Sequence, residues 1–319
     1  MIPIYIFSLP RSGSTLLQRI LASHTAIETA PEPWIALPVF LAPKPDDICA
    51  TYDHSRASHA IKDVVESLPN GIADFRFEAA QFLRQIYRKT STTSAHYFLD
   101  KTPRYHLIAE DLIEAFPDAK FIFVWRNPLA IVASMMDTWS AGKWNLHLFS
   151  IDLYRGLENL IEAYTKYEDR VVSIRYEDIV AEPTESIEQL SEYLSLPDLG
   201  EVFSALRSLG TIDAPGRGDP TGQYKYKHVS QESLNTWKTT LANPVRKRWA
   251  KQYIDWIGEA NLQLMGYSLN DIQSELRAAP LRLQYTASDI LRRAYGKRRL
   301  IGGTQSPDSR YRGIRFRRN

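Results

Sequence analysis

The 319-residue sequence contains a single cysteine, Cys49, and no long hydrophobic run. One cysteine excludes an internal disulfide and a cysteine-based zinc site, and it is typical of a reducing compartment. No apolar segment approaches the roughly 18 residues that a membrane-spanning helix requires. An apolar strand is predicted to begin at residue 2, which leaves no room for the basic region and apolar core of a signal peptide. These absences predict a cytoplasmic protein.

The net charge of +2 is unevenly distributed along the chain. Residues 292–319 contain ten Lys or Arg and one acidic residue, a net charge of +9, so the remainder carries about −7. Apolar residues lie at or just before the start of this basic segment: Tyr285, Ile290, Leu291 and Tyr295. We predict one domain over 1–280 and a basic extension over 281–319. The segment 292–319 suits a peripheral contact with an anionic membrane, at its inner face, or with an acidic glycan; a solvated tail is the alternative. No nucleic-acid partner is expected.

The first 24 residues have the pattern of a phosphate-binding strand, loop and helix. Residues 2–7 (IPIYIF) suit a buried parallel strand, and an apolar helical pattern follows residue 15. In such a unit the loop amides and the positive helix end face an anion. Gly13 allows a close backbone approach, and Arg11 offers a guanidinium fork for phosphate or sulfate oxygens. A strand–turn–helix without a ligand is the alternative.

The loop departs from the Walker pattern G-x-x-x-x-G-K-[ST] at one decisive position. Gly13 and Thr15 fit, Ser8 takes the place of the first glycine, and Ser14 stands where the pattern has lysine. That lysine contacts the β- and γ-phosphates of a nucleotide triphosphate. Its absence favours an anionic ligand that is not a triphosphate.

Strands and helices are predicted to alternate along the rest of the chain. Further strands are predicted at 97–99, 121–125 and 171–176, whereas prolines make 25–56 a segment of loops and short turns and glycines make 210–228 a long loop or lid. Helices are predicted at about 59–68, 75–90, 104–116, 128–139, 148–168, 183–195, 199–209, 230–241, 244–264 and 284–295. This alternation predicts an α/β fold, a P-loop-like parallel sheet with helices on both faces.

The carboxyl edge of that sheet is predicted to carry a cationic site. Loop 8–15, Lys101, Arg126 and Tyr176 all follow strands, and ligands of such folds bind beyond the strand ends. A Mg²⁺-dependent nucleoside triphosphatase would place an acidic residue at the end of a neighbouring strand to help hold the metal. Arg126 occupies that position after 121–125, although Asp100 follows 97–99. The set suits a multiply charged anion bound without metal.

The segments 10–17 (PRSGSTLL) and 125–134 (WRNPLAIVAS), with the spacing between them, resemble sulfotransferases that use 3′-phosphoadenosine 5′-phosphosulfate (PAPS). The closest pattern is that of tyrosylprotein, bacterial and carbohydrate sulfotransferases, and the resemblance covers roughly residues 1–240. It implies the sulfotransferase type of the α/β fold, with PAPS as co-substrate and no metal.

The resemblance also implies roles for individual residues. Glu32 corresponds to the catalytic base and Lys101 to the lysine that stabilises the transition state. The 5′-phosphosulfate loop corresponds to Arg11, Ser12, Gly13, Ser14 and Thr15. The 3′-phosphate pair corresponds to Arg126 and Ser134, and two further nucleotide-binding positions correspond to Tyr176 and Lys227. The imidazoles of His24 and His106 are alternatives to Glu32 as the base.

The function expected from this resemblance is transfer of a sulfuryl group from PAPS to a hydroxyl acceptor. A glycan, a glycolipid or a small metabolite is favoured over protein tyrosine, with a carbohydrate or lipid-linked glycan as the expected partner. Aromatic side chains that could stack on such an acceptor are Trp34, Trp139, Trp144 and Tyr154. The alternatives are a P-loop phosphotransferase using ATP or GTP and a non-catalytic module that binds a nucleotide or a polyanion.

Overall fold

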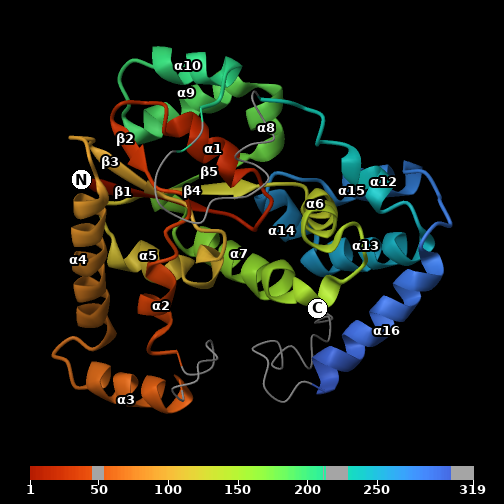
Figure 1. Ribbon diagram of the computed structural model, residues 1–319, viewed down its shortest axis with the longest axis horizontal. Helices are drawn as coiled ribbons and strands as arrows, with labels where there is room; N and C mark the ends of the chain where they lie inside the picture. The colour runs from red at the N-terminus through yellow and green to blue at the C-terminus, as the bar shows by residue number, and fades with distance from the viewer. Residues whose placement is uncertain (45–53, 211, 213–228, 303–319) are drawn as a thin grey trace.

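A five-stranded parallel sheet forms the centre of the protein (Figure 1). The computed structural model describes residues 1–44, 54–210, 212 and 229–302, and for Ser55 and residues 297–302 the backbone alone. The strand order is β2-β3-β1-β4-β5, and all neighbouring pairs are parallel. The strands are β1 (Ile2–Phe7), β2 (Ile27–Thr29), β3 (Tyr97–Asp100), β4 (Lys120–Trp125) and β5 (Val171–Arg175).

The two faces of the sheet carry different side chains because successive strand residues point to opposite sides. Tyr5 and Phe7 of β1 belong to a core rich in aromatic residues, together with residues of β3 and β4 such as Phe98 and Phe121. Ile4 and its aliphatic neighbours form a separate core on the other face. Each face is therefore covered, as parallel sheets require.

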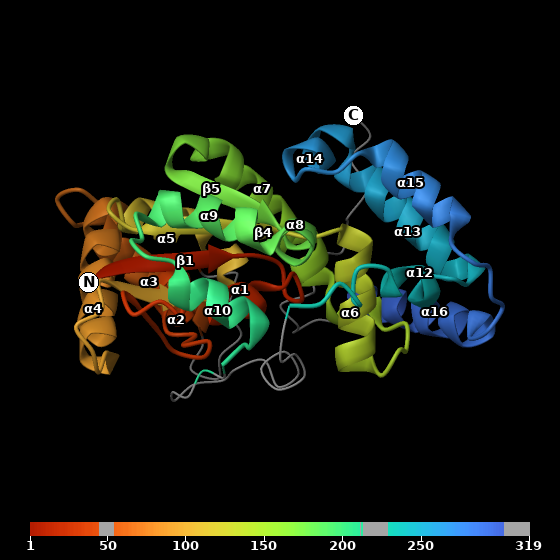
Figure 2. The same ribbon diagram turned by 90° about the horizontal axis from the view of Figure 1, so that it is seen from above.

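Helices cover both faces (Figures 1 and 2). The aliphatic core is shared with α1 (Ser14–Leu21), α8 (Tyr176–Ala181), α9 (Pro183–Leu194) and α10 (Gly200–Arg207). The aromatic core is shared with α2 (Ala36–Leu41), α4 (Ile72–Thr90), α5 (Ala109–Ala115) and α7 (Leu157–Lys166), and α3 (His54–Glu66) packs against α4. Short helical segments connect some of these elements. They are the 3₁₀ turns η1 (Tyr105–Leu107), η2 (Leu146–Leu148) and η4 (Glu168–Arg170) and the π-helix η3 (Ile151–Gly156).

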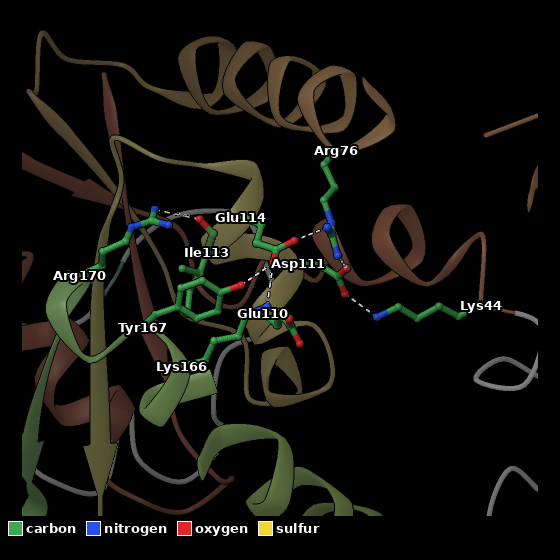
Figure 3. A network of polar contacts seen from close by, with 9 residues as sticks. All are labelled: Lys44, Arg76, Glu110, Asp111, Ile113, Glu114, Lys166, Tyr167 and Arg170. Atoms are coloured by element: carbon green, nitrogen blue, oxygen red, sulfur yellow. Dashed lines mark hydrogen bonds and ion pairs between the residues drawn. The ribbon is translucent and has the colours of Figure 1, made fainter. Parts of the chain in front are cut away.

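An ion-pair network joins the helices on the aromatic face (Figure 3). Asp111 of α5 accepts from Arg76 Nη2 of α4 at 2.9 Å and is also paired with Lys44. Glu114, one turn further along α5, pairs with Arg76 and accepts from Lys166 of α7 at 3.1 Å. The carboxylates of α5 thus hold α4 and α7 together at the protein surface.

The C-terminal helices gather beside α6 (Pro128–Ser140), beyond the end of β4 (Figure 2). They are α12 (Thr236–Thr240), α13 (Pro244–Ile257), α14 (Glu259–Leu264), α15 (Leu269–Ala278) and α16 (Thr286–Gly302). The start of α16 packs against α13 and η2. The boundary between a domain over 1–280 and an extension over 281–319 stays a prediction, and residues 303–319 lie outside the described residues. No helix in the described part of the chain is both long and apolar enough to cross a membrane.

The predicted α/β architecture and its four strands are confirmed, with differences in detail. The segment 25–56, predicted as loops and turns, contains β2 and α2; Pro38 lies in the first turn of α2, where the missing amide costs no helical hydrogen bond. The predicted helix at 230–241 is reduced to α12, α15 was not predicted, and α16 continues past 295 to Gly302. The loop predicted at 210–228 lies largely outside the described residues.

Candidate active site

The loop between β1 and α1 has a conformation that depends on Gly13. Its φ of +89° lies in the left-handed region, and Gly13 is the N-cap of α1. A Cβ atom at this position would lie 2.2 Å from Cδ2 of Tyr176. Glycine is therefore required both by the backbone conformation and by the neighbouring ring. The consequence is that the loop amides and the start of α1 come close to the residue that follows β5.

Arg126 joins this loop to the end of β4. Asn127 caps α6 by accepting from Leu129 N and so fixes the chain directly after Arg126. The Arg126 guanidinium donates from Nη1 to the Arg11 carbonyl at 2.7 Å and lies 4.3 Å from the Tyr176 ring centroid. Its Nε atom is buried without a hydrogen-bond partner among the described residues. Burial lowers the pKa of Arg126, and Tyr176 and Glu177 act in the opposite direction.

A second unused donor lies in the loop itself. Ser12 Oγ is buried and has no hydrogen-bond partner among the described residues. A buried polar atom without a partner is costly, so two such atoms at one sheet edge indicate a place where a polar ligand binds. Arg11 Nε donates to Ser134 Oγ of α6 at 3.3 Å, and the Arg11 guanidinium carbon lies 6.0 Å from the Trp139 ring.

Lys101 connects the loop to Glu32. Its Nζ donates to Glu32 Oε1 at 2.6 Å and to Thr15 Oγ1 at 3.1 Å. The Lys101 side chain is 2% exposed and that of Glu32 is 9% exposed. Glu32 has a φ of +36° and Trp34 a φ of +59°. Left-handed conformations at non-glycine residues are unfavourable and cluster at functional sites, where the surrounding structure holds them.

Asp100, directly before Lys101, does not face the same space. Its Oδ2 accepts from Tyr87 at 2.7 Å and from Tyr105 at 2.8 Å, and the residue is fully buried. Burial raises the pKa of Asp100 to about 6, although hydrogen bonds from both tyrosines and Thr102 favour the charged form. A carboxylate held in this way is not available to bind Mg²⁺ at the loop. No group of three or more His, Cys, Asp and Glu residues that could hold a metal occurs in the described ranges.

A cavity of about 360 Å³ opens beside the Glu32–Lys101 pair. Its walls combine the loop, the pair and several aromatic and polar side chains: Pro10, Arg11, Ser14, Thr15, Glu32, Trp34, Lys101, Pro103, Arg104, Trp139, Leu148, Phe149 and Asp152. The reactive groups of the sequence-based hypothesis therefore face a space that can hold a second substrate.

The two histidines proposed as alternative bases lie elsewhere. His24 Nε2 is 2.8 Å from the Pro197 carbonyl, and its Nδ1 accepts from Ala26 N, so this ring fixes the turn after α1. His106 is fully buried, and its Nε2 lies 2.9 Å from Asp152 Oδ1. Neither imidazole lines the cavity. Glu32 is thus better placed to meet an acceptor than either histidine.

Of the four aromatic residues predicted to contact an acceptor, two line the cavity and two do not. Trp34 and Trp139 line the cavity, as expected. Trp144 does not: it is 1% exposed and packs edge-on against Trp249. Tyr154 packs against Tyr253 and Trp256 instead. Both belong to the packing of the C-terminal helices, because apolar rings that follow α6 find a large core there.

Three polar residues of the site, Ser233, Arg104 and Asp152, were not identified from the sequence. Ser233 receives a hydrogen bond on its carbonyl from Arg126 Nη2 at 3.3 Å, and its Oγ lies 2.6 Å from Tyr176 Oη. Arg104 and Asp152 line the cavity and pair with each other at 3.3 Å. No local motif marks them, although a π-helix such as η3, which carries Asp152, is frequent at functional sites. The predicted nucleotide contact Lys227 lies outside the described residues.

The chain is similar to several known proteins. A family model described as "Sulfotransferase family" matches residues 3–200. Nodulation protein NoeE of Sinorhizobium fredii is 27% identical over 74% of this chain and 60% of its own length, so the chain corresponds to less than two thirds of that relative. Protein-tyrosine sulfotransferase 1 of Danio rerio is 26% identical over 77% of this chain and 68% of its own length. Omega-hydroxy-beta-dihydromenaquinone-9 sulfotransferase Stf3 of Mycobacterium bovis is 24% identical over 46% of this chain and 39% of its own length.

A solved structure shares the fold. The sulfotransferase domain from the curacin biosynthetic pathway superposes with a TM-score of 0.51 and 21% identity, covering 78% of this chain and 96% of that domain. The family match extends over more than half of the chain and includes the loop, Glu32, Lys101 and Arg126. This chain belongs to the sulfotransferase family.

Proposed function

We propose that the protein transfers a sulfuryl group from PAPS to a hydroxyl acceptor. The observation that carries the proposal is the hydrogen-bonded series Glu32–Lys101–Thr15, with donor–acceptor distances of 2.6 and 3.1 Å. In this series the Lys101 cation is bonded both to the Glu32 carboxylate, which can accept a proton, and to Thr15 of the anion-binding loop. All three residues line the cavity. General-base catalysis and electrostatic stabilisation require these groups within reach of one reacting centre.

The donor nucleotide would bind across the carboxyl edge of the sheet. The amides of 12–15, the Ser12 hydroxyl and Arg11 would hold the 5′-phosphosulfate, with Ser14 and Thr15 as further donors. Arg126, whose Nε is buried without a partner among the described residues, would hold the 3′-phosphate with Ser134. Tyr176 supports both ends, because its ring lies against Arg126 and next to Gly13. Lys227, which lies outside the described residues, stays a predicted contact of the nucleotide.

The reaction would proceed by direct displacement at sulfur. Glu32 takes the proton of the acceptor hydroxyl, whose oxygen then forms a bond to sulfur while the bond from sulfur to the bridging phosphate oxygen breaks. Lys101 stabilises the negative charge that develops on the sulfuryl oxygens and on the departing 5′-phosphate. Positioning and electrostatics account for the rate, and no metal is needed for this step.

The lining of the cavity beside Glu32 and Lys101, here called the acceptor cavity, favours a glycan, a glycolipid or a small metabolite as acceptor. Trp34 and Trp139 offer ring faces, and Arg104 with Asp152 offers hydrogen bonds to hydroxyl groups. Stf3 is named for a hydroxylated menaquinone and the zebrafish relative for protein tyrosine, so both lipid-like and protein acceptors occur among the relatives.

Two measurements test the activity and its rivals. Adenosine 3′,5′-bisphosphate should raise the thermal midpoint, whereas ATP with Mg²⁺ and heparin should not; the reverse pattern would support a kinase or a polyanion-binding module. Transfer of labelled sulfate from PAPS to a panel of sugars, glycolipids and phenols then identifies the acceptor class. Failure of both measurements would contradict the proposal.

The basic segment 292–319 is proposed as a peripheral contact with an anionic membrane or an acidic glycan in the cytoplasm. Removal of 303–319 leaves α16 in place and tests the outer part of this segment. Sedimentation of the full chain with anionic vesicles should decrease with salt, since exposed charges are screened, and the truncated chain should bind less. Absence of binding by the full chain at low salt would leave a solvated tail.

A further inference from the structure

A second cavity, of about 500 Å³, lies outside the first one, between η2 and α16. Asn145, His147 and Leu148 form one wall, and α16 forms the other with Ser288, Leu291, Arg292 and Tyr295. None of the described residues predicted to bind the nucleotide or to act in catalysis lines it. Its position raises the question of whether it is part of the substrate-binding surface.

The two cavities adjoin at Leu148, which lines both of them. We call the acceptor cavity beside Glu32 the inner cavity and the one beside α16 the outer cavity. Next to Leu148, the rings of Phe149 and Trp139, which also line the inner cavity, pack against each other with centroids 5.6 Å apart. An acceptor that binds near Glu32 and is long enough to pass Leu148 would enter the outer cavity.

The α16 wall is fixed to the body of the protein. Asp289 is 1% exposed and accepts from Arg246 Nε at 2.7 Å and from Asn243 Nδ2 at 2.6 Å. Arg292 Nη1 donates to Asn145 Oδ1 at 3.1 Å across the floor of the cavity. The missing side chain of Gly296 permits close packing, since a Cβ there would lie 3.0 Å from His147 Nδ1. These contacts make the outer cavity a built feature of the fold.

The exposed surface of this cavity is mainly apolar. Leu148, Leu291 and Tyr295 are 52%, 71% and 51% exposed, and none of the described residues that line the cavity is acidic. The side-chain oxygen Oδ1 of Asn145, which could accept from a sugar hydroxyl, already accepts a hydrogen bond from Arg292. Large apolar side chains left exposed beside an active site gain free energy when a hydrocarbon covers them.

We propose that the outer cavity binds the hydrocarbon chain of an amphiphilic acceptor whose hydroxyl-bearing head occupies the inner cavity. The proposal rests on the sulfotransferase function proposed above and specifies the acceptor class. It also gives the start of α16 a part in acceptor binding.

Binding of n-alkyl β-D-glucosides from methyl to decyl, each below its critical micelle concentration, tests this proposal. Titration calorimetry with and without adenosine 3′,5′-bisphosphate should give an affinity that rises about twofold to fourfold for each methylene that becomes buried. Leu291→Glu should reduce the affinity for decyl glucoside to that for methyl glucoside. Ile290→Glu, at a 54% exposed neighbour on the same helix that does not line the cavity, should keep the wild-type dependence.

Three outcomes separate this proposal from the proposed function. Affinity that does not depend on chain length, while the bisphosphate binds normally, overturns the acceptor proposal alone. Equal losses in Leu291→Glu and Ile290→Glu mean adsorption to the whole helix and also overturn it. If the bisphosphate does not bind, the proposed function fails, and the titrations without nucleotide still decide whether the cavity holds an alkyl chain.

Discussion

Two charged regions of this protein each centre on an arginine, and they differ in the groups that accept hydrogen bonds from that arginine. In the network on the aromatic face, Arg76 binds the carboxylates of Asp111 and Glu114, and each carboxylate has a second cationic partner (Figure 3). At the carboxyl edge of the sheet, Arg126 binds two backbone carbonyls, and the described residues give it no carboxylate within ion-pair distance.

The difference separates a structural network from a ligand site. Charges that neutralise each other across helices need no further partner. Arg126 has no carboxylate partner among the described residues, and the buried Ser12 hydroxyl has no hydrogen-bond partner among them, so an anion can complete both. An unpaired Nε alone does not distinguish the regions, because Arg76 Nε is also buried without a partner in the described ranges. Substitutions in each should therefore act on different properties.

The largest effect is expected for Glu32→Gln. Loss of the proton acceptor should lower turnover by about 10² to 10⁴, while affinity for adenosine 3′,5′-bisphosphate stays near the wild-type value, because the carboxylate faces the acceptor cavity. Initial rates of labelled sulfate transfer and calorimetric titration measure the two quantities. Near-normal turnover would assign the base role to water or another group, and loss of folding would make Glu32 structural.

Asp100→Asn tests a carboxylate that adjoins the site without facing it. With the pKa of Asp100 raised to about 6 in the folded state, the folded protein binds a proton that the unfolded chain releases near pH 4. Wild-type stability should therefore decline as pH rises from about 4 to 6, and the amide variant should lack this part of the decline. The difference in unfolding free energy between variant and wild type should shift by about 2 to 3 kcal/mol in favour of the variant between pH 4 and pH 7.

Denaturant titrations at several pH values measure that difference. Both tyrosines donate to Oδ2 of Asp100, and an amide oxygen in that place can accept both bonds, whereas the amide NH2 group cannot accept from Thr102 Oγ1 as Oδ1 does. The variant can therefore be less stable at every pH without affecting the test. A difference that does not change with pH would show that the pKa of Asp100 is not raised.

Arg126→Ala should act on one end of the nucleotide. Loss of a charge-assisted contact should weaken binding of adenosine 3′,5′-bisphosphate by roughly 1.5 to 3 kcal/mol. Adenosine 5′-phosphosulfate, which lacks the 3′-phosphate, should lose much less. Calorimetry with both ligands makes the comparison, and equal losses would reject the assignment of Arg126 to the 3′-phosphate.

Arg76→Met is expected to have the smallest effect and serves as the matched control. Lys44 and Lys166 still neutralise Asp111 and Glu114, so the loss of stability should be about 1 kcal/mol or less. Affinity for the bisphosphate and turnover should equal those of the wild type. A loss of nucleotide binding comparable to that in Arg126→Ala would remove the distinction between the two regions.

Local sequence patterns predicted the parts of the fold that local physics determines. The apolar runs of β1 and β4 are long enough to identify buried strands, and Asn127 followed by Pro128 marks the start of α6. β2 has three residues in a proline-rich segment and gains its pairing only from β3. A periodic pattern needs more residues than that, so tertiary contact decided this strand.

The site was predicted unevenly for the same reason. The loop with Arg11 and Gly13 carries its own signal, because strand, small residues and helix are contiguous. The approach of Glu32 to Lys101, 69 positions apart, came from the family resemblance and not from the spacing. Ser233 and Asp152 reach the site only through the packing of distant segments, and such residues have no local pattern to reveal them.

Tyr176 is in contact with both halves of the proposed donor site. Its ring lies against the Arg126 guanidinium and also leaves no room for a side chain at Gly13. One aromatic ring thereby fixes the distance between Arg126 and the loop at Gly13, which are the two groups proposed to hold the 3′-phosphate and the 5′-phosphosulfate. A donor of the wrong length would satisfy one end and place its sulfur out of line with the acceptor oxygen, so selection of the donor would be expressed in the rate of transfer more than in affinity.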